Sequence, residues 1–449
     1  MPLMMSVSGV RGVIGESMTP VLAAELGCAF GTFLGGGRVV VGRDSRPSGP
    51  MIQQALVAGL TAAGCEVIVL DVASTPAVAL MVRRRGAAGG VVITASHNPV
   101  IWNGIKFLTG EGLAPPPEQA AELFEIHRRR AFRLADVEGL RPAESDASAD
   151  ETHVEAALAL AEVSSVAARR FKVVLDSVNG AGGREGRMLL ERLGCRVIPL
   201  NPEPTGRFAH TPEPLAENLT GLSAAVREAG ADVGFAQDPD ADRLAIVDEH
   251  GRYIGEEYTL ALAAMHLFAT RPGPAAANLS TSRMIDDLAA AAGGPCRVYR
   301  SAVGEANVVA AMKAHGCAFG GEGNGGIIDL RVGPVRDSLV AMALVLQLMA
   351  SSGESISGLA GRIPSYVMIK EKFPCSPERI AAAVAAVRAH FAGARLSDID
   401  GVRADFDDAW VHVRGSNTEP IIRVIAEAPT ADRCRALVAE IRQVAGLVA

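Results

Sequence analysis

Short apolar runs rich in β-branched residues alternate along the chain with longer segments of helical period, which predicts a parallel α/β fold. Three of these runs, at residues 64–68, 194–198 and 295–299, open in a similar way, each after an Ala- and Leu-rich helical segment. A strand with a polar exit precedes each run, and a third strand that ends in an unusual loop follows it. The repeat predicts three homologous mixed α/β/α domains whose third-strand loops occupy equivalent corners.

The pattern changes beyond residue 365, where Ala-rich helical stretches flank two strands, at 409–414 and 421–425. This part predicts a smaller α+β C-terminal domain. Polar or Pro-containing linkers near 140–151, 251–257 and 363–365 supply the boundaries. We therefore expect four domains, which are listed here by residue: 1–145, 146–252, 253–364 and 365–449.

Composition narrows the classes of function. At 449 residues the chain is too long for one core, and its net charge of −7 argues against a nucleic-acid partner. Phosphorylated ligands stay open, because local arginines can oppose the overall sign. No apolar run reaches the roughly 20 residues of a membrane span, and the N-terminus lacks the features of a signal peptide. The seven cysteines are scattered without a zinc-like spacing, so we expect a cytoplasmic protein with reduced thiols.

Ser96 lies in the stretch Thr-Ala-Ser-His-Asn-Pro at residues 94–99, directly after a predicted buried strand at 89–93. Ligands of open α/β sheets gather at the carboxyl ends of strands, and a hydroxyl beside His97 is well placed there to carry a transferable group. Taken alone, an ordinary turn is the better interpretation, because Ser, Asn and Pro are common turn residues. The other loops of the chain reverse this preference.

Asp238, Asp240 and Asp242 alternate along a second loop and offer oxygen ligands for a hard divalent cation such as Mg²⁺. An EF-hand is excluded, because its sixth position needs Gly and is Arg243 here. A phosphatase with an Asp nucleophile stays open, although Asp242 stands where that signature has Thr or Val. A solvated acidic turn is disfavoured, because close carboxylates repel one another without a cation.

Two further loops suggest a phosphorylated sugar. Arg-Gly-Ser-Asn-Thr-Glu-Pro at 414–420 and the following Arg423 combine guanidiniums with hydroxyls, which suits a phosphate, although a polar hairpin turn is the alternative. The glycine-rich segment 320–326 would let the backbone approach a ligand closely, and its Glu322 and Asn324 can bind sugar hydroxyls. Lys106 and Arg11 could add cations beside Ser96, but as isolated residues both are more often surface charges.

Together these motifs resemble those of the α-D-phosphohexomutase family, which comprises phosphoglucomutases, phosphomannomutases and phosphoglucosamine mutases. Ser-Gly-Val-Arg-Gly at 8–12 is similar to the family's N-terminal signature, 94–99 to its phosphoserine loop and 238–243 to its magnesium loop. Residues 321–326 are similar to its sugar-recognition loop and 414–420 to its phosphate loop. The resemblance covers essentially the whole chain. It implies four domains around a central cleft, which carry the phosphoserine, the metal, the sugar-recognition loop and the phosphate-binding loop, in that order.

The resemblance also implies a mechanism. Ser96 would carry a phosphoryl group, and Mg²⁺ would be held by this group and by Asp238, Asp240 and Asp242. Charge neutralisation would come from Arg243 and Lys106, and acid–base assistance from Arg11 and Lys106, with His97 beside the reacting serine. A hexose 1,6-bisphosphate would be the intermediate and activator, and the last domain would rotate about the linker near Pro364. The phosphate that is not transferred would rest on the following residues: Arg414, Ser416, Asn417, Thr418 and Arg423.

Departures from the family pattern bear on the substrate. Ser6 and Val7 stand where the N-terminal signature has Gly and Thr. The sugar loop ends Asn-Gly-Gly, without the histidine of many glucose and mannose enzymes, and this form resembles phosphoglucosamine mutases. We expect glucosamine 6-phosphate as the substrate of a monomer or homodimer, with glucose or mannose phosphates as the alternative. A metal-dependent sugar phosphatase and a non-catalytic sugar-phosphate sensor are more distant alternatives.

Overall fold

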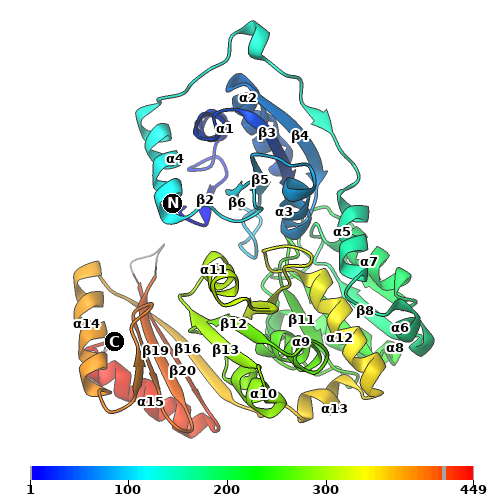
Figure 1. The fold of residues 1–449 in the computed structure, drawn as a ribbon, viewed down its shortest axis with the longest axis vertical. Coiled ribbons are helices and arrows are strands. Elements are labelled where there is room, and N and C mark those ends of the chain that lie inside the picture. The colour runs from blue at the N-terminus through cyan, green and yellow to red at the C-terminus, as the bar shows by residue number, and fades with distance from the viewer. Residues whose placement is uncertain (1–2, 417–420, 448–449) are drawn as a thin grey trace. The chain divides into compact units, whose positions relative to one another are not determined.

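The computed structural model describes residues 3–416 and 421–447. Figure 1 shows the helices and strands of the chain, coloured by residue number. The chain forms two compact units. The first unit consists of Met1–His266 and Asn324–Ala360, and the second of Leu267–Gly323 and Gly361–Ala449. Each unit is therefore made of two segments, and the segments of the two units alternate along the chain.

A seven-stranded sheet forms the first part of the first unit, in the order β1-β2-β6-β5-β3-β4-β7. Thr19 and Ser74 cap the first turns of α1 and α3 with their side chains, and a proline follows each cap. The strands are β1 (Met4–Ser6), β2 (Gly9–Val13), β3 (Gly37–Arg43), β4 (Cys65–Val72), β5 (Gly89–Ile93), β6 (Trp102–Thr109) and β7 (Glu144–Ser145). The helices are α1 (Pro20–Leu34), α2 (Gly49–Ala62), α3 (Thr75–Arg84) and α4 (Pro117–Arg129), followed by a 3₁₀ turn at Val137–Gly139.

Alternation along β3 explains the layers of this sheet. Val39 and Val41 pack into the core under α1 and α2, whereas Val40 packs with α3 on the other face. Successive side chains of a strand point to opposite faces, so a continuous apolar run requires helices on both sides. The observed three layers, α/β/α, follow from this requirement.

The second part of the first unit contains a four-stranded sheet in the order β11-β10-β8-β9. Its strands are β8 (Lys172–Asp176), β9 (Arg196–Leu200), β10 (Val233–Gln237) and β11 (Leu244–Val247). Its helices are α5 (Ala149–Leu158), α6 (Val163–Arg169), α7 (Gly183–Arg192) and α8 (Thr220–Ala229), with a 3₁₀ turn at Ala216–Asn218. The returning segment adds β15 (Gly326–Ile328), α12 (Ser338–Ser352) and α13 (Ile356–Gly361).

The second unit begins within α9 (Glu257–Thr270) and contains a third parallel arrangement. Here β12 (Pro274–Asn278) pairs in parallel with β13 (Arg297–Ser301) and β14 (Phe319–Glu322). The helices between these strands are α10 (Met284–Ala292) and α11 (Glu305–His315). We call the three repeated arrangements modules; their three parallel strands are β3–β5, β8–β10 and β12–β14. In each module the first of these strands lies between the other two.

The three modules share one topology. The first strand, β3, β8 or β12, pairs in parallel with the second strand on one side and with the third strand on the other. The predicted repeat and the α/β fold class are thus confirmed. The flanking antiparallel strands β1, β2 and β6 were not expected, because their residues mix polar and apolar positions without a clear period.

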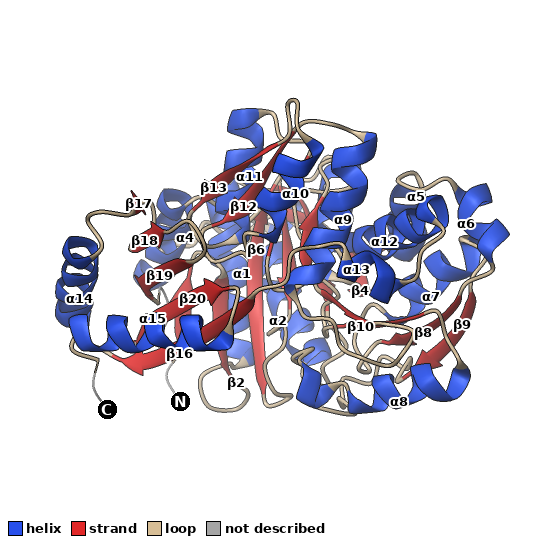
Figure 2. Ribbon diagram, turned by 90° about the horizontal axis from the view of Figure 1, so that it is seen from below, coloured by secondary structure: helices blue, strands red, loops and turns tan. Residues whose placement is uncertain are grey.

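The C-terminal part is an antiparallel five-stranded sheet in the order β16-β20-β19-β18-β17, with two helices packed on it (Figure 2). It confirms the smaller α+β domain. Its elements are β16 (Val367–Pro374), α14 (Pro377–His390), β17 (Arg395–Ser397), β18 (Val402–Asp405), β19 (Trp410–Gly415), β20 (Ile421–Ala428) and α15 (Ala431–Val444). Among the described residues of the whole chain, no helix has the length and apolar character needed to cross a bilayer.

Candidate active site

Ser96 is buried in the loop directly after β5 and adopts a left-handed backbone conformation, with φ of 50°. Its Oγ donates to Asp238 Oδ2 at 3.1 Å and lies 3.4 Å from His97 Nδ1. Burial, together with Arg243 and Arg11, lowers the pKa of His97 to about 3. The imidazole is therefore neutral near pH 7 and cannot compete with Mg²⁺ as a cation beside Ser96.

The acidic loop connects β10 to β11, and its three aspartates lie in the first unit with Ser96. Asp238, Asp240 and Asp242 are almost completely buried, and one carboxylate oxygen of each lies within 4.8 Å of those of the others. Asp240 Oδ1 and Asp242 Oδ1 have no hydrogen-bond partner. Burial and the two neighbouring carboxylates raise the pKa of Asp238 well above its usual range. A hard cation would relieve both the repulsion and the unpartnered oxygens, so the residues fit Mg²⁺.

Donors from other elements hold the outer oxygens of this cluster. Asp240 Oδ2 accepts from Thr75 Oγ1 at 2.6 Å and from Lys106 Nζ at 2.7 Å. Burial alone would raise the pKa of Asp240, but the Lys106 ammonium outweighs it and holds the pKa below its usual range. Asp242 Oδ2 accepts from Arg336 Nη2 at 2.6 Å. The Oδ1 atoms of the same two aspartates accept no hydrogen bond, although Arg243 Nε lies 3.6 Å from Asp242 Oδ1 and forms an ion pair with it.

Two more of the predicted cations lie in this unit. Arg243 donates its backbone N–H to Asp238 Oδ1 at 3.2 Å, which orients this carboxylate. Arg11, on β2, donates from Nη1 to Asn98 Oδ1 at 3.3 Å, so its guanidinium lies against the loop of Ser96. Burial lowers the pKa of Arg11, while the coulombic effect of Asp240 opposes this shift. An arginine remains charged even so.

Glu322 ends β14 in the second unit and is buried. Its Oε1 accepts from Asn278 Nδ2 at 2.7 Å and from the Gly304 backbone N–H at 3.1 Å. Asn324 begins the segment that belongs to the first unit. Two of the neighbouring glycines serve packing within the chain: a Cβ at Gly325 would lie 2.5 Å from Leu244 O, and one at Gly326 would lie 2.2 Å from Arg336 Cδ. Close approach to a ligand is therefore not needed to explain these two positions.

Arg414 and Arg423 face each other across the β19–β20 ladder in the second unit, and Lys372 on β16 lies opposite Arg423. Directly opposite residues share a face of the sheet, and like charges there repel one another unless an anion intervenes. Arg414 Nε also pairs with Asp400 Oδ2 at 2.8 Å. Ser416, at the end of β19, donates its N–H to Ile421 O, whereas Asn417 and Thr418 lie outside the described residues.

The predicted residues therefore divide between the two units. The first unit contains these: Arg11, Ser96, His97, Lys106, Asp238, Asp240, Asp242, Arg243 and Asn324. The second contains Glu322, Arg414, Ser416 and Arg423. Thr75, Arg336 and Lys372 were missed, because nothing in the spacing of the sequence ties them to the aspartates or to the paired arginines.

Comparison with known proteins places the motifs in a family. The models of the phosphoglucomutase/phosphomannomutase family match four consecutive parts of the chain. These are the α/β/α domain I at residues 3–134, domain II at 151–251, domain III at 256–366 and the C-terminal domain at 369–444.

Two relatives and one solved structure illustrate the similarity. A protein of Methanopyrus kandleri named "Probable phosphoglucosamine mutase" is 38% identical over 434 residues, which cover 96% of this chain and 95% of that protein. A "Phosphoglucomutase/phosphomannomutase" of Thermococcus kodakarensis is 39% identical over 95% of each chain. The crystal structure of a phosphoglucomutase/phosphomannomutase family protein from Burkholderia thailandensis aligns with a TM-score of 0.86 at 27% identity, covering 99% of this chain and 98% of that one.

Proposed function

Because the chain belongs to the phosphoglucomutase/phosphomannomutase family and is thus a phosphohexomutase, we propose that it interconverts glucosamine 6-phosphate and glucosamine 1-phosphate through phospho-Ser96. The observation that carries the role of Ser96 is its position. Its hydroxyl is 3.1 Å from Asp238, in a buried cluster of three aspartates of which two have an oxygen that accepts no hydrogen bond. That arrangement suits a serine whose phosphoryl group shares a cation with the aspartates.

Each phosphoryl transfer exchanges one P–O bond for another. Phospho-Ser96 gives its phosphoryl group to the free hydroxyl of the hexose monophosphate, which loses a proton while Ser96 Oγ gains one. The resulting hexose 1,6-bisphosphate turns round, and its other phosphate returns to Ser96. Lys106 and Arg11 are the proposed cations for acid–base assistance, with Arg243 stabilising charge. Mg²⁺, held by Asp238, Asp240 and Asp242, would neutralise charge on the transferred group.

The phosphate that is not transferred is proposed to bind the cross-strand pair Arg414 and Arg423, together with Ser416, Asn417 and Thr418. Glu322 and Asn324 are proposed to bind the sugar. The pairing of two guanidiniums on one face of the sheet supports this assignment, because neighbouring arginines can donate several charge-assisted hydrogen bonds to one phosphate. Under this proposal, residues from both units act on one substrate. The proposal also includes a hexose 1,6-bisphosphate as the activator.

Two observations support glucosamine as the sugar of the substrate: the names of the relatives and the sequence of the sugar loop. Several relatives that span nearly the whole chain are named as probable phosphoglucosamine mutases. The sugar loop ends in Asn324 and two glycines and has no imidazole. A relative with the broader name phosphoglucomutase/phosphomannomutase supports the alternative of glucose and mannose phosphates.

Phosphorus NMR of the protein with Mg²⁺ and a trace of glucose 1,6-bisphosphate tests the activity. The 6-phosphates of glucosamine, glucose and mannose are supplied separately. We expect a growing sugar 1-phosphate signal, fastest for glucosamine. Release of inorganic phosphate alone would identify a phosphatase and would remove the role of Ser96 as a phosphoryl carrier.

Replacing the proposed carrier separates chemistry from folding. Ser96→Ala is expected to abolish turnover, because among the described residues no other hydroxyl donates to Asp238, while Mg²⁺ binding by calorimetry persists. Ser45→Ala is the control, since Ser45 Oγ donates to the Asn179 carbonyl and not to the aspartates. Turnover by Ser96→Ala near that of the unaltered protein would contradict the mechanism.

A further inference from the structure

Arg46 is a completely buried arginine beside Ser96 that the proposed mechanism does not use. It lies in the turn between β3 and α2, and its Nε donates to Asp44 Oδ2 at 2.9 Å. An arginine has five N–H donors in a fixed plane, and all five have acceptors here. The two terminal nitrogens donate to four backbone carbonyls of one loop: Ser96 (2.6 Å), Asn98 (2.7 Å), Pro99 (2.8 Å) and Trp102 (3.2 Å).

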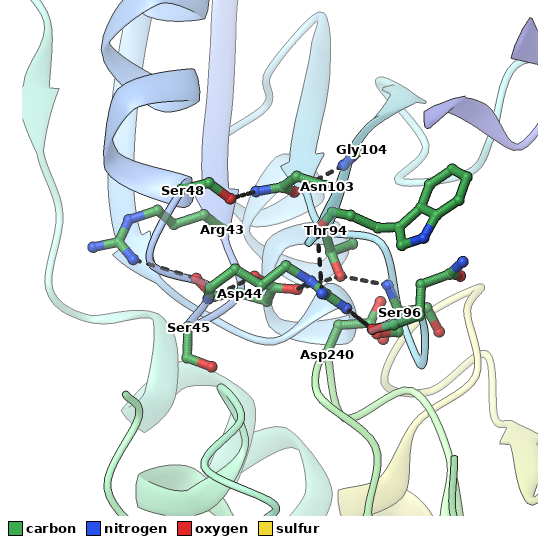
Figure 3. A network of polar contacts seen from close by, with 12 residues as sticks. Arg43, Asp44, Ser45, Ser48, Thr94, Ser96, Asn103, Gly104 and Asp240 are labelled. Carbon is green, nitrogen blue, oxygen red and sulfur yellow. Dashed lines mark hydrogen bonds and ion pairs between the residues drawn. The ribbon is translucent and has the colours of Figure 1, made fainter. Parts of the chain in front are cut away.

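The same network also binds the backbone N–H of Ser96. The Ser96 backbone N–H donates to Thr94 Oγ1 at 2.9 Å, and the Thr94 hydroxyl donates to Asp44 Oδ2 at 2.7 Å (Figure 3). Both backbone polar groups of Ser96 are thus anchored, directly or through Thr94, to the Asp44–Arg46 pair. The left-handed conformation of Ser96 is sterically unfavourable for a residue with a Cβ, so it persists only where its surroundings enforce it.

The internal repeat supports a positioning role, because the same turn recurs at the end of each first strand. A side-chain oxygen of Asp44, Asp176 and Asn278 accepts the backbone N–H two residues later, at 2.9, 3.0 and 2.8 Å. In the third module the remaining atom of this side chain, Asn278 Nδ2, donates to Glu322, the residue at which the third strand, β14, passes into its loop. In the first module Asp44 Oδ2 accepts from Thr94, in the equivalent loop. The turn therefore positions a neighbouring functional loop in two of the three modules.

We propose that Arg46, Asp44 and Thr94 are positioning residues that fix the Ser96 hydroxyl at the metal cluster for phosphoryl transfer. The inference rests on the proposed function, because it concerns how the same serine is held. None of the three forms a hydrogen bond or ion pair with the described aspartates of the metal loop, so they act through the backbone of Ser96.

Thr94 offers the cleanest test, because Val and Ser separate its shape from its hydroxyl. Thr94→Val keeps the shape and removes both hydrogen bonds, whereas Thr94→Ser keeps the hydroxyl. We expect Thr94→Val to lower kcat by about 10- to 100-fold, with KM changed less than about threefold, because displacement of a reacting group by about 1 Å is that costly. Thr94→Ser is expected to stay within about threefold of the unaltered enzyme.

Arg46→Lys is the second variant, since lysine keeps the charge but cannot reach four carbonyls at once. It is expected to show the same loss of kcat and the same retention of KM. Hydrogen exchange of residues 94–102 supplies a readout that does not need activity. We expect faster exchange of this loop in Thr94→Val and Arg46→Lys, and unchanged Mg²⁺ binding in Thr94→Val.

The outcomes separate the inference from the function on which it rests. If the unaltered protein transfers no phosphoryl group, the proposed function fails, and loop exchange alone decides whether the network holds Ser96. If the unaltered protein is active and both variants keep kcat within about threefold, or only KM changes, the positioning role is overturned. Unchanged exchange of residues 94–102 in both variants overturns it as well.

Discussion

At the level of single residues, the metal loop shows why the aspartates are held ready for a cation. Lys106 and Arg336 donate to the Oδ2 atoms of Asp240 and Asp242, whereas the Oδ1 atoms accept no hydrogen bond. Asp242 Oδ1 has the Arg243 guanidinium 3.6 Å away. Buried polar atoms are rarely left unsatisfied, and an unpartnered carboxylate oxygen is costly. The cluster is therefore stabilised most by a cation that several carboxylate oxygens coordinate at once.

Removing the negative charge of one of the three aspartates tests whether the loop binds a cation. Asp242→Asn is expected to weaken Mg²⁺ binding by at least about tenfold, because ligand charge sets affinity at such oxygen sites. Isothermal titration calorimetry measures the change. Asp71→Asn is the matched control: Asp71 is exposed, pairs with Arg43, and has a φ of 62° that asparagine tolerates. Equal Mg²⁺ affinity in the two variants would exclude the loop as the metal site.

His153 is a second residue with unusual surroundings. It is completely buried, with Nδ1 2.8 Å from Glu185 Oε2 and Nε2 2.7 Å from Asp337 Oδ2. Burial alone would lower its pKa, but the carboxylates of Asp337 and Glu185 outweigh it and raise the pKa well above the usual 6.5. The folded protein thus contains a buried imidazolium that joins α5, α7 and the N-terminus of α12.

A pH-dependent loss of stability follows from that shift. The folded pKa of His153 lies above the unfolded one, so its stabilisation is complete below about pH 6.5 and declines as the pH rises through the folded pKa. His153→Gln is expected to lower the free energy of unfolding by roughly 3 kcal/mol at low pH, because it leaves buried carboxylates unpaired. The deficit should shrink at alkaline pH. Urea unfolding of both proteins across this range measures it, with the exposed His250→Gln as control. A deficit independent of pH would show that His153 is neutral.

The residues predicted from the sequence were those that lie in recognisable loops. Ser96, the three aspartates and Arg414 each stand in a motif, and the structure places Ser96 beside the aspartates. Arg46 and Arg336 could not be found in this way, because their importance depends on which loops they reach after folding. A single arginine in a turn is ordinarily a surface charge.

At the level of secondary structure, the turns after the first strands are the elements that position loops. In the third module, Asn278 Nδ2 donates to Glu322 Oε1, and its Oδ1 accepts from Ser280 N–H and Thr281 Oγ1. The amide therefore uses its donor and its acceptor for different partners. Only a side chain with both can hold Glu322 and close the turn.

Asn278→Asp tests this arrangement. The substitution keeps the turn but sets two carboxylates against each other, so we expect Glu322 to move and the KM for the sugar phosphate to rise by about tenfold. Asn201→Asp is the matched control, because Asn201 Nδ2 also donates to a buried carboxylate, that of Asp176, in another module. Steady-state kinetics of both variants make the comparison. An equal rise in KM in both would assign the effect to general destabilisation.

Strand β6 shows what element-level prediction missed. Lys106 was expected to bring a cation beside Ser96, but no strand was expected there; it lies on β6, opposite Val92 of β5. The run Trp-Asn-Gly-Ile-Lys at 102–106 has no strict alternation, so its strand character depends on pairing with β2 and β5. That pairing fixes the register that directs the Lys106 ammonium to Asp240.

At the level of the whole molecule, the compact units do not coincide with the sequence repeat. The boundaries predicted near residues 145, 252 and 364 remain a prediction, whereas the contacts assign Asn324–Ala360 to the first unit. This returning segment supplies α12, which is buried over Ser338–Met349, as well as Arg336 and Asp337. A pattern of strands and helices cannot show that a segment will complete the core of an earlier module, because burial depends on tertiary contacts.

The returning segment should therefore be required for the first unit to fold. A chain that ends at Gly323 loses the carboxylate that pairs with His153 and, among other buried groups, six completely buried large side chains of α12: Leu339, Val340, Met342, Leu344, Val345 and Leu346. At roughly 2 kcal/mol for each side chain the loss is about 12 kcal/mol, comparable to the whole stability of a typical domain. We expect this chain to aggregate, or to lack a cooperative thermal transition and Mg²⁺ binding. A chain that ends at Tyr366 retains the segment and should show both. Cooperative unfolding of the shorter chain would mean that α12 is an accessory helix, and Mg²⁺ binding by it would mean that the metal loop keeps its structure without Arg336.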